Sequence, residues 1–378
     1  MTSFADRFAP FDLAYLDAAS QGPLPLAAVR AGREALALKE RPYRIPSGLA
    51  LTLTAEVRAL YARLFSCREE AVALTTGAGA AVNAVARGLD WKEGDEVVLS
   101  DGEFPSNDWP WRLLARCGVR VVRVKPPERA IAVTAEGLAA ALTPRTRVVA
   151  FAHVSYLHGG RLDPAPVVAA ARAAGALTLV DGSQAAGAVP FDFGASGVDV
   201  YTACAYKHLL GPYGSAVALF SPAALERLGS GDLAWQSVKG SEDVSRLPRG
   251  ELELRPGAVR FDAHEAASFG NLMPLADSLR LILEATPHGV QAHARALGDR
   301  ILAKLPAAFV PASPLEPVQR SHILCVAGRD PRATAAAHAR LLAAKIQVAL
   351  RGDRLRISPH LHNSDADVER LLAVLASE

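Results

Sequence analysis

Short β-branched runs alternate with longer segments rich in Ala, Leu and Arg between about residues 50 and 220, and this alternation restricts the fold more than any other feature. Regularly alternating segments of these two kinds are typical of crossover units that build a mostly parallel sheet with both faces covered. Ligands of such sheets bind at the carboxyl ends of the strands. The runs predicted to be strands are 96–100, 120–124, 147–155, 177–181, 198–205 and 215–220, and the predicted helices between them are 80–89, 109–118, 135–142 and 164–175.

The pattern changes after about residue 225. Residues 229–257 are polar with little periodicity, which predicts a long loop over the surface or at a subunit contact. Beyond them we expect helices and a smaller α+β unit, whose last helix is preceded by Ser364 and Asp367 at the spacing of a capping box. The predicted helices are 274–285, 288–305, 333–345 and 364–376, and the predicted strands are 322–328, 346–350 and 354–358.

Composition excludes several classes of protein. The 378 residues are half hydrophobic, enough for a large core and about two domains. Lys plus Arg (41) nearly balance Asp plus Glu (39), which argues against a nucleic-acid partner. No apolar stretch reaches the roughly 18–20 residues of a membrane span, and the first twelve residues do not resemble a secretory signal. The four cysteines lack CxxC spacing, so we expect free thiols in a reducing cytoplasm and no metal site.

Three polar features follow predicted strands. Residues 73–89 place Gly77, Ala78 and Gly79 just before a helix, where free backbone N–H groups and the helix dipole would hold a phosphate, although a plain strand-to-helix turn also explains them. Asp181 ends an apolar strand, where a buried carboxylate needs a partner, unless it only caps the next turn. Gln184 lies three residues further on and could reach the same ligand.

The stretch ACAYKHLLGPYG (203–214) places Lys207 at the end of the next strand, 26 residues after Asp181 (207 − 181). An acid, an amide and a lysine on neighbouring strand ends beside a phosphate site suit pyridoxal 5′-phosphate (PLP). This cofactor needs an amine for its aldehyde, an anion for its ring nitrogen and a donor for its phenolate. We therefore expect Lys207 to form the Schiff base.

The chain resembles the class V aminotransferase family of fold-type I PLP enzymes, which includes cysteine desulfurases, isopenicillin-N epimerase-like proteins and kynureninase. The resemblance is carried by VDGSQAAGAVPFD, GVDVYTACAYKHLLGPYG and LRISPHLHN, and one branch also shares SDGEFPSNDWPW and RFDAHEAASFGNLMPL. It implies a PLP-dependent transferase fold of type I, with a mostly parallel seven-stranded sheet in a large domain and a smaller α+β C-terminal domain. The implied division is an N-terminal segment near the active site (1–25), a large PLP-binding domain (26–285) and a small domain (286–378).

The resemblance also implies roles for single residues, in which Lys207 is the imine lysine, Asp181 the pyridine partner and Gln184 the contact of the phenolate oxygen. Phe104 falls where the family stacks an aromatic ring on the cofactor, although a core phenylalanine is the alternative. Arg356 matches the arginine that binds the substrate α-carboxylate, a task suited to a planar guanidinium, and a surface arginine is the alternative. The backbone amides of Gly77, Ala78 and Gly79 would bind phosphate, and Asp17, Ala18 and Ala19 would lie near the substrate.

Several positions depart from the family pattern. Cys204 and Tyr206 replace a serine and a histidine near the phosphate, and Tyr156 replaces the asparagine of desulfurases. Ala78 and Gly79 stand where desulfurases usually have two threonines. The resemblance implies a homodimer, in which His264 and Glu265 would reach the neighbouring active site in place of a glycine-rich turn.

The family carries out many reactions on amino acids. Desulfurases have a nucleophilic cysteine on a loop shortly before the arginine that matches Arg356, and this chain has none there. Cys325 lies in an apolar run, where a packed thiol is expected. Transamination, β-elimination and racemisation remain after Lys207 removes the Cα proton from an external aldimine. Family usage makes aminotransferase the nominal prediction, with a lyase or an epimerase as alternatives.

Two further hypotheses stay open from the residues. One is an NAD-type oxidoreductase that uses TGAGAAVN as its glycine loop, and the other is an inactive binding protein of the same fold. His153 and His158 flank a strand end and are candidates for acid-base catalysis, with a structural role as the alternative. His208 follows the lysine and is expected to point away from the site.

Overall fold

The computed structural model describes residues 4–229 and 233–377. Its centre is a seven-stranded sheet of order β2-β8-β7-β6-β5-β3-β4, in which only β8 runs antiparallel to its neighbours. The predicted mostly parallel sheet is confirmed. Its strands are β2 (Val72–Thr75), β3 (Glu96–Ser100), β4 (Arg120–Val124), β5 (Thr146–Ala152), β6 (Leu177–Asp181), β7 (Val200–Cys204) and β8 (Ala216–Phe220).

Successive residues of the central strands enter two different cores, which explains their nearly continuous hydrophobic sequences. Val97 and Leu179 pack with helices α3 (Ala78–Gly88), α4 (Trp109–Leu113) and α8 (Pro222–Arg227) on one face. Val98 and Val180 pack on the other face, whose helices are α2 (Leu49–Leu64), α5 (Ala135–Ala140), α6 (Pro164–Ala174), α7 (Phe193–Ser196) and α9 (Phe269–Ala285). Helix α1 (Leu26–Glu40) packs against α9.

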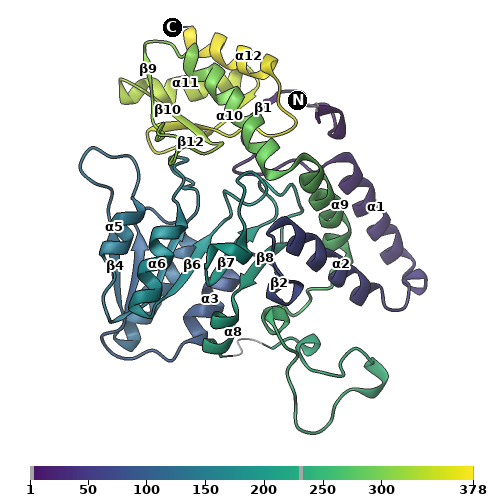
Figure 1. The fold of residues 1–378 in the computed structure, drawn as a ribbon. Helices are drawn as coiled ribbons and strands as arrows, with labels where there is room; N and C mark the ends of the chain where they lie inside the picture. Colours follow the sequence, from purple (N-terminus) through teal and green to yellow (C-terminus); the bar gives the residue numbers. More distant parts are fainter. Residues whose placement is uncertain (1–3, 230–232, 378) are drawn as a thin grey trace.

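The C-terminal part builds a second, smaller unit with its own core (Figure 1). Its antiparallel sheet has the order β12-β13-β10-β9, formed by β9 (Phe309–Pro311), β10 (Leu324–Gly328), β12 (Ala349–Arg351) and β13 (Arg354–Ile357). The helices are α10 (Pro287–Ala303), α11 (Pro331–Ala343) and α12 (Asp365–Ala376). The N-terminal strand β1 (Ala14–Tyr15) pairs in parallel with β11 (Ile346–Gln347), so the two ends of the chain meet in this unit.

Some element boundaries differ from the expectations. The predicted helix 109–118 is wrong in its second half: α4 ends at Leu113 and continues as a tighter 3₁₀ turn over Leu114–Cys117. Helix α9 begins at Phe269, five residues before the predicted start, because Pro274 sits inside the helix and does not begin it. The capping box of Ser364 and Asp367 is confirmed at the start of α12.

The predicted long loop is also present. Its described residues contain the 3₁₀ turns Trp235–Ser237 and Val244–Arg246 and one isolated bridge between Val238 and Leu254. Figure 1 shows this segment projecting beyond the large sheet, on the side away from the C-terminal unit. None of the helices within the described ranges is both long and apolar enough to cross a membrane.

Candidate active site

A cavity of about 220 Å³ lies at the carboxyl ends of β6 and β7, where the sheet topology predicts a ligand. Its walls come from β5 and from the segments after β2, β3, β6 and β7, which are far apart in sequence. Ten of the residues predicted for the site line it, whereas Arg356, Asp17, Ala18 and Ala19 do not. The ten are Gly77, Ala78, Gly79, Phe104, Tyr156, Asp181, Gln184, Cys204, Tyr206 and Lys207. The fold therefore brings the separate motifs together around one space.

The turn between β2 and α3 forms the phosphate end of this cavity. Helix α3 begins at Ala78, so the N–H groups of Ala78 and Gly79 have no partner within the helix, whereas the Ala80 N–H donates to the Gly77 carbonyl (3.0 Å). A Cβ added at Gly77 would meet nothing within 4 Å, which shows that open space lies beside this backbone. Thr202 Oγ donates to the Ala78 carbonyl (3.2 Å) and anchors the turn to β7. Backbone N–H groups at the positive end of a helix suit an anion such as phosphate.

Asp181 and Lys207 are opposite charges that line the same cavity. Both side chains are largely buried, with 7% and 8% of their surface exposed. Asp181 Oδ1 accepts a hydrogen bond from the Ser183 N–H (2.8 Å). Within residues 4–229 and 233–377, neither charge has an ion-pair partner. Because an unpaired charge is costly to bury, this arrangement fits a ligand that offers a cation to Asp181 and an aldehyde to Lys207. The residues therefore fit PLP.

The backbone around Lys207 is held by a close approach of the N-terminal segment. The Gly22 N–H donates to the Tyr206 carbonyl (2.7 Å), and a Cβ at Gly22 would stand 1.9 Å from the Lys207 carbonyl oxygen. Leu210 has a φ of 57°, in the left-handed region, and its N–H donates to the Lys207 carbonyl (3.1 Å). Sequence reasoning missed Gly22, because only its distance in space from Lys207 gives it this role.

Aromatic rings border the lysine. The Lys207 ammonium lies 5.6 Å from the ring centroids of both Phe104 and Tyr206. Phe104 is 43% exposed and packs edge-on against Tyr156 at 5.2 Å, so it is not a core phenylalanine. Burial raises the pKa of Tyr156, with the nearby arginines opposing the shift, so its hydroxyl remains protonated at neutral pH.

Gln184 is held from two sides at the wall of the cavity. Its Nε2 donates to the Ala19 carbonyl (3.0 Å), and its Oε1 lies 3.0 Å from His208 Nε2. The predicted residue Ala19 therefore contributes through its backbone and lies behind the cavity wall.

Arg356 is buried, with 1% of its surface exposed, which rules out the alternative of a surface arginine. Its Nη1 donates to the Tyr156 carbonyl (3.0 Å), and its Nη2 donates to Asp17 (3.2 Å) and to Ser20 Oγ (2.8 Å). Burial lowers the pKa of Arg356, and the Asp17 carboxylate opposes this shift. Arg351 Nη2 also donates to Ser20 Oγ (3.3 Å), so two guanidinium groups meet at one hydroxyl.

Glu103, directly before Phe104, is a buried carboxyl that sequence reasoning missed. It accepts hydrogen bonds from the Ala152 N–H (2.8 Å), from Asn107 Nδ2 (2.7 Å) and from Ser100 Oγ. Burial raises the pKa of Glu103 to about 7, because its effect is larger than the opposing effect of these three hydrogen bonds. The sequence did offer a signal for Glu103, because it is an acidic residue in the motif SDGEFPSNDWPW, which follows a predicted strand.

The two candidate acid-base histidines do not line the cavity. His153 is buried against Phe191 and Tyr201, and burial lowers its pKa to about 4. His158 Nδ1 accepts the Gly160 N–H (3.0 Å), and burial lowers its pKa to about 4 as well. Both are structural histidines in this fold.

The two buried cysteines, Cys204 in the cavity wall and Cys325 outside it, are not activated as nucleophiles. Cys325 is buried in β10, its thiol donates to the Leu157 carbonyl (3.5 Å), and burial raises its pKa to about 11. Burial also raises the pKa of Cys204. Strands β12 and β13 are joined by a turn at Gly352 and Asp353, which has no room for a mobile loop.

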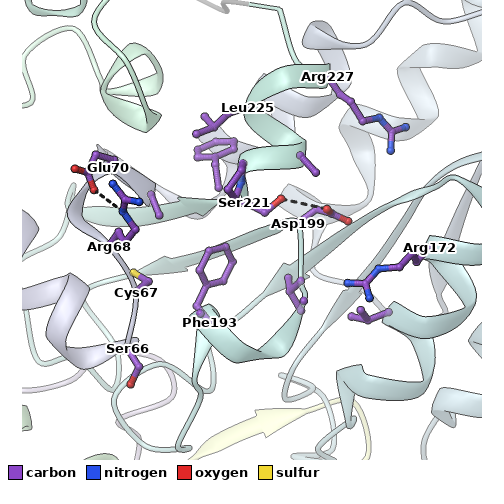
Figure 2. Close-up of a pocket in the computed structure, with 18 of the residues that line it drawn as sticks. Ser66, Cys67, Arg68, Glu70, Arg172, Phe193, Asp199, Ser221, Leu225 and Arg227 are labelled. Atoms are coloured by element: carbon purple, nitrogen blue, oxygen red, sulfur yellow. Dashed lines mark hydrogen bonds and ion pairs between the residues drawn. The ribbon is translucent and has the colours of Figure 1, made fainter.

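A second cavity of about 800 Å³ lies at the opposite end of the strands (Figure 2). Both of its acidic residues already have partners: Asp199 accepts from Ser221 Oγ (3.2 Å) and from the N–H and hydroxyl of Thr178, and Glu70 pairs with Arg68 (3.3 Å). None of the residues predicted for the site lines this cavity, so size alone does not mark the active site.

Known proteins match the chain over nearly its whole length. The model of the family Aminotransferase class-V matches residues 14–371. Isopenicillin N epimerase from Streptomyces clavuligerus is 29% identical, over 95% of this chain and 93% of that protein. A probable cysteine desulfurase from Pseudomonas aeruginosa is also 29% identical, over 97% and 94%.

Solved structures share the fold. The complex of the cystine C-S lyase C-DES with its product cysteine persulfide has a TM-score of 0.85 at 24% identity, over 97% of each chain. An apo cysteine desulfurase from Thermococcus onnurineus has a TM-score of 0.86 at 20% identity, over 100% of this chain and 98% of that one.

Proposed function

The chain belongs to the class V aminotransferase family, whose cofactor is PLP, and we propose that it epimerises or racemises an amino acid with Lys207 as the proton-transferring base. The observation that carries the proposal is the buried pair of Asp181 and Lys207, which line one cavity without protein counter-ions among the described residues. Membership of the family disfavours the NAD-type oxidoreductase, and the intact pair disfavours an inactive binding protein.

When bound, PLP withdraws electrons from the Cα of an attached amino acid and so makes the Cα proton acidic. In this proposal the N–H groups of Ala78 and Gly79 at the start of α3 would bind the phosphate, and Asp181 would keep the ring nitrogen protonated. Gln184 donates to the phenolate oxygen. The Lys207 amine would remove the Cα proton from one face. Inversion requires that a proton return to the opposite face, for which the Tyr156 hydroxyl in the same cavity is the proposed donor.

The substrate carboxylate would bind beside Tyr156, at the guanidinium groups of Arg356 and Arg351. Asp17 already balances one of these two positive charges, so the pair keeps a net charge of about +1 for an anion. A carboxylate that replaced the Ser20 hydroxyl as their common acceptor would gain two charge-assisted hydrogen bonds. The site therefore fits a substrate with a free carboxylate.

Epimerisation is favoured over desulfuration because burial raises the pKa of both Cys204 and Cys325 and so disfavours a nucleophilic thiolate at either position. The full-length relatives include an epimerase and a probable cysteine desulfurase, so they do not separate the two reactions. Tyr156 adds a second group that carries a proton in the same cavity. The nominal prediction of an aminotransferase is the second candidate, since Lys207 alone could move the proton that this reaction requires. A lyase would use the same groups on a substrate with a leaving group.

We also propose that the enzyme is a cytoplasmic homodimer. His264 and Glu265 are exposed side chains on the segment before α9, where they are free to contact a partner subunit. Light scattering on the purified protein measures the oligomeric state. A monomer at micromolar concentration would contradict this part of the proposal.

The reaction is tested with the PLP-loaded protein and a panel of amino acids in D₂O. Epimerisation predicts deuterium at Cα together with the inverted enantiomer, whereas transamination yields a keto acid and elimination releases ammonia. Lys207→Ala is the control, and it should abolish both the exchange and the borohydride-reducible visible band. Exchange that persisted in Lys207→Ala would refute the assignment of the base.

A further inference from the structure

His208 follows Lys207 in the chain, but its ring turns behind the cavity wall and contacts Gln184. His208 Nε2 lies 3.0 Å from Oε1 of the lining residue Gln184, and His208 itself is not among the residues that line the cavity. The histidine is completely buried. The side chain next to the proposed catalytic lysine therefore contacts the residue proposed to bind the cofactor's phenolate oxygen.

The direction of these hydrogen bonds follows from the Ala19 carbonyl. A carbonyl oxygen can only accept, so the Gln184 group 3.0 Å away must be the NH₂, and Oε1 must face His208. An amide oxygen also only accepts, so His208 Nε2 must carry a hydrogen. This leaves one hydrogen of Gln184 Nε2 unused, on a side chain that lines the cavity.

Two histidines of the C-terminal unit hold His208 in place. His322 Nε2 lies 3.3 Å from His208 Nε2, with the two rings nearly perpendicular, and it can only accept a share of the hydrogen that His208 Nε2 donates to Gln184. His360 Nε2 lies 3.1 Å from the His208 carbonyl, to which it donates. All three rings are buried, and burial together with their mutual repulsion lowers the pKa of His208 well below its usual value. The charges of Lys207 and Arg356 act in the same direction. The His208 ring is therefore neutral at physiological pH.

We propose that His208 is a positioning residue, whose neutral Nε2–H fixes the Gln184 amide so that its free N–H is presented to the phenolate oxygen of PLP. The inference rests on the proposed role of Gln184 in the site. It predicts that the C-terminal unit influences the cofactor through His322, His208 and Gln184, since His208 is the only described partner of Gln184 Oε1, while the Ala19 carbonyl holds the Nε2 end of the same amide.

The test uses the PLP-loaded protein and two readouts besides turnover: the apparent pKa of the visible cofactor band and the dissociation constant of PLP from the apoprotein. His208→Asn is too short to reach Gln184, whereas His208→Gln places an N–H donor near the position of Nε2. We expect His208→Asn to raise the band pKa by about 0.5–1 unit, because an oriented donor to the phenolate is lost, and to weaken PLP binding about fivefold. His208→Gln should restore most of both.

His362→Gln is the matched control, because His362 is also buried but bonds the Tyr15 carbonyl (2.9 Å) and not Gln184. A double-mutant cycle with Gln184→Leu separates positioning from a general structural effect. In the Gln184→Leu background, His208→Asn should cause no further shift. Additive shifts, or a His208→Asn band like that of the wild type, would overturn the inference. If the wild-type protein forms no visible band with PLP, the proposed function fails instead.

Discussion

Removing the Arg356 guanidinium tests the carboxylate site independently of the natural substrate. Aminooxyacetate and methoxyamine both react with a PLP imine, but only aminooxyacetate carries a carboxylate. The ratio of their reaction rates therefore measures how strongly the protein recognises a carboxylate on the reagent whose nitrogen attacks the imine. We expect Arg356→Gln to lower this ratio and to leave the rate with methoxyamine nearly unchanged.

The magnitude follows from the contacts of Arg356. A hydrogen bond to a charged group contributes about 1.5–3 kcal/mol, so losing the guanidinium should lower the ratio about 10- to 150-fold. The substitution also leaves Asp17 buried without its cation, which costs about 3–5 kcal/mol of folding stability. The double variant Asp17→Asn/Arg356→Gln removes both charges, and it should regain much of the stability while keeping the low ratio.

The assay follows the loss of the visible band by stopped flow at several reagent concentrations. Arg354→Gln is the matched control, because Arg354 lies on the same strand but pairs with Asp353 (3.1 Å). Asp17→Asn alone should raise the ratio, since it frees one N–H of Arg356 and leaves its charge unbalanced. The reasoning is refuted if Arg356→Gln keeps the wild-type ratio, or if Asp17→Asn lowers it.

Three further predictions concern stability and cofactor binding. Because the pKa of Glu103 is raised to about 7, the folded state binds this proton more tightly than the unfolded state does. As the pH rises from about 4.5 to 7, the melting temperature of the wild type should therefore fall relative to that of Glu103→Gln. A constant difference across that range would contradict this. His322 has a pKa lowered to about 3, so its contribution to stability is lost as the pH falls below about 6.5. His322→Leu should therefore show a shallower drop in melting temperature between pH 7 and 5, and an equally steep drop would count against it. Gly22→Ala should weaken PLP binding more than tenfold, measured by titration of the apoprotein, because its methyl group would stand 1.9 Å from the Lys207 carbonyl, whereas Gly270→Ala, with nothing within 4 Å, should not.

The fold class could be predicted because it depends on local patterns. Val97–Leu99 and Leu179–Val180 are consecutive apolar residues that alternate between the two cores, which occurs when both faces of a strand are covered. The end of the helix 109–118 could not be predicted, since apolar residues recur at helical spacing as far as Leu114. The backbone nevertheless changes to a 3₁₀ turn at Leu114–Cys117, which ends at Gly118 in the left-handed region. The sequence predicts that helix α9 begins at Pro274, because a proline is common in the first turn of a helix. In the structure Pro274 lies inside the helix, which begins at Phe269.

The sequence by itself determined the cofactor chemistry, because Asp181, Gln184 and Lys207 stand at strand ends within motifs whose spacing is local. Only the tertiary structure decided how these groups are held. The contacts of Gly22 with Tyr206, of Arg356 with Asp17, and of Gln184 with Ala19 and His208 join segments up to 339 residues apart. Local patterns carry no information on such pairs, since the packing of the two units against each other and against the N-terminal segment sets these distances.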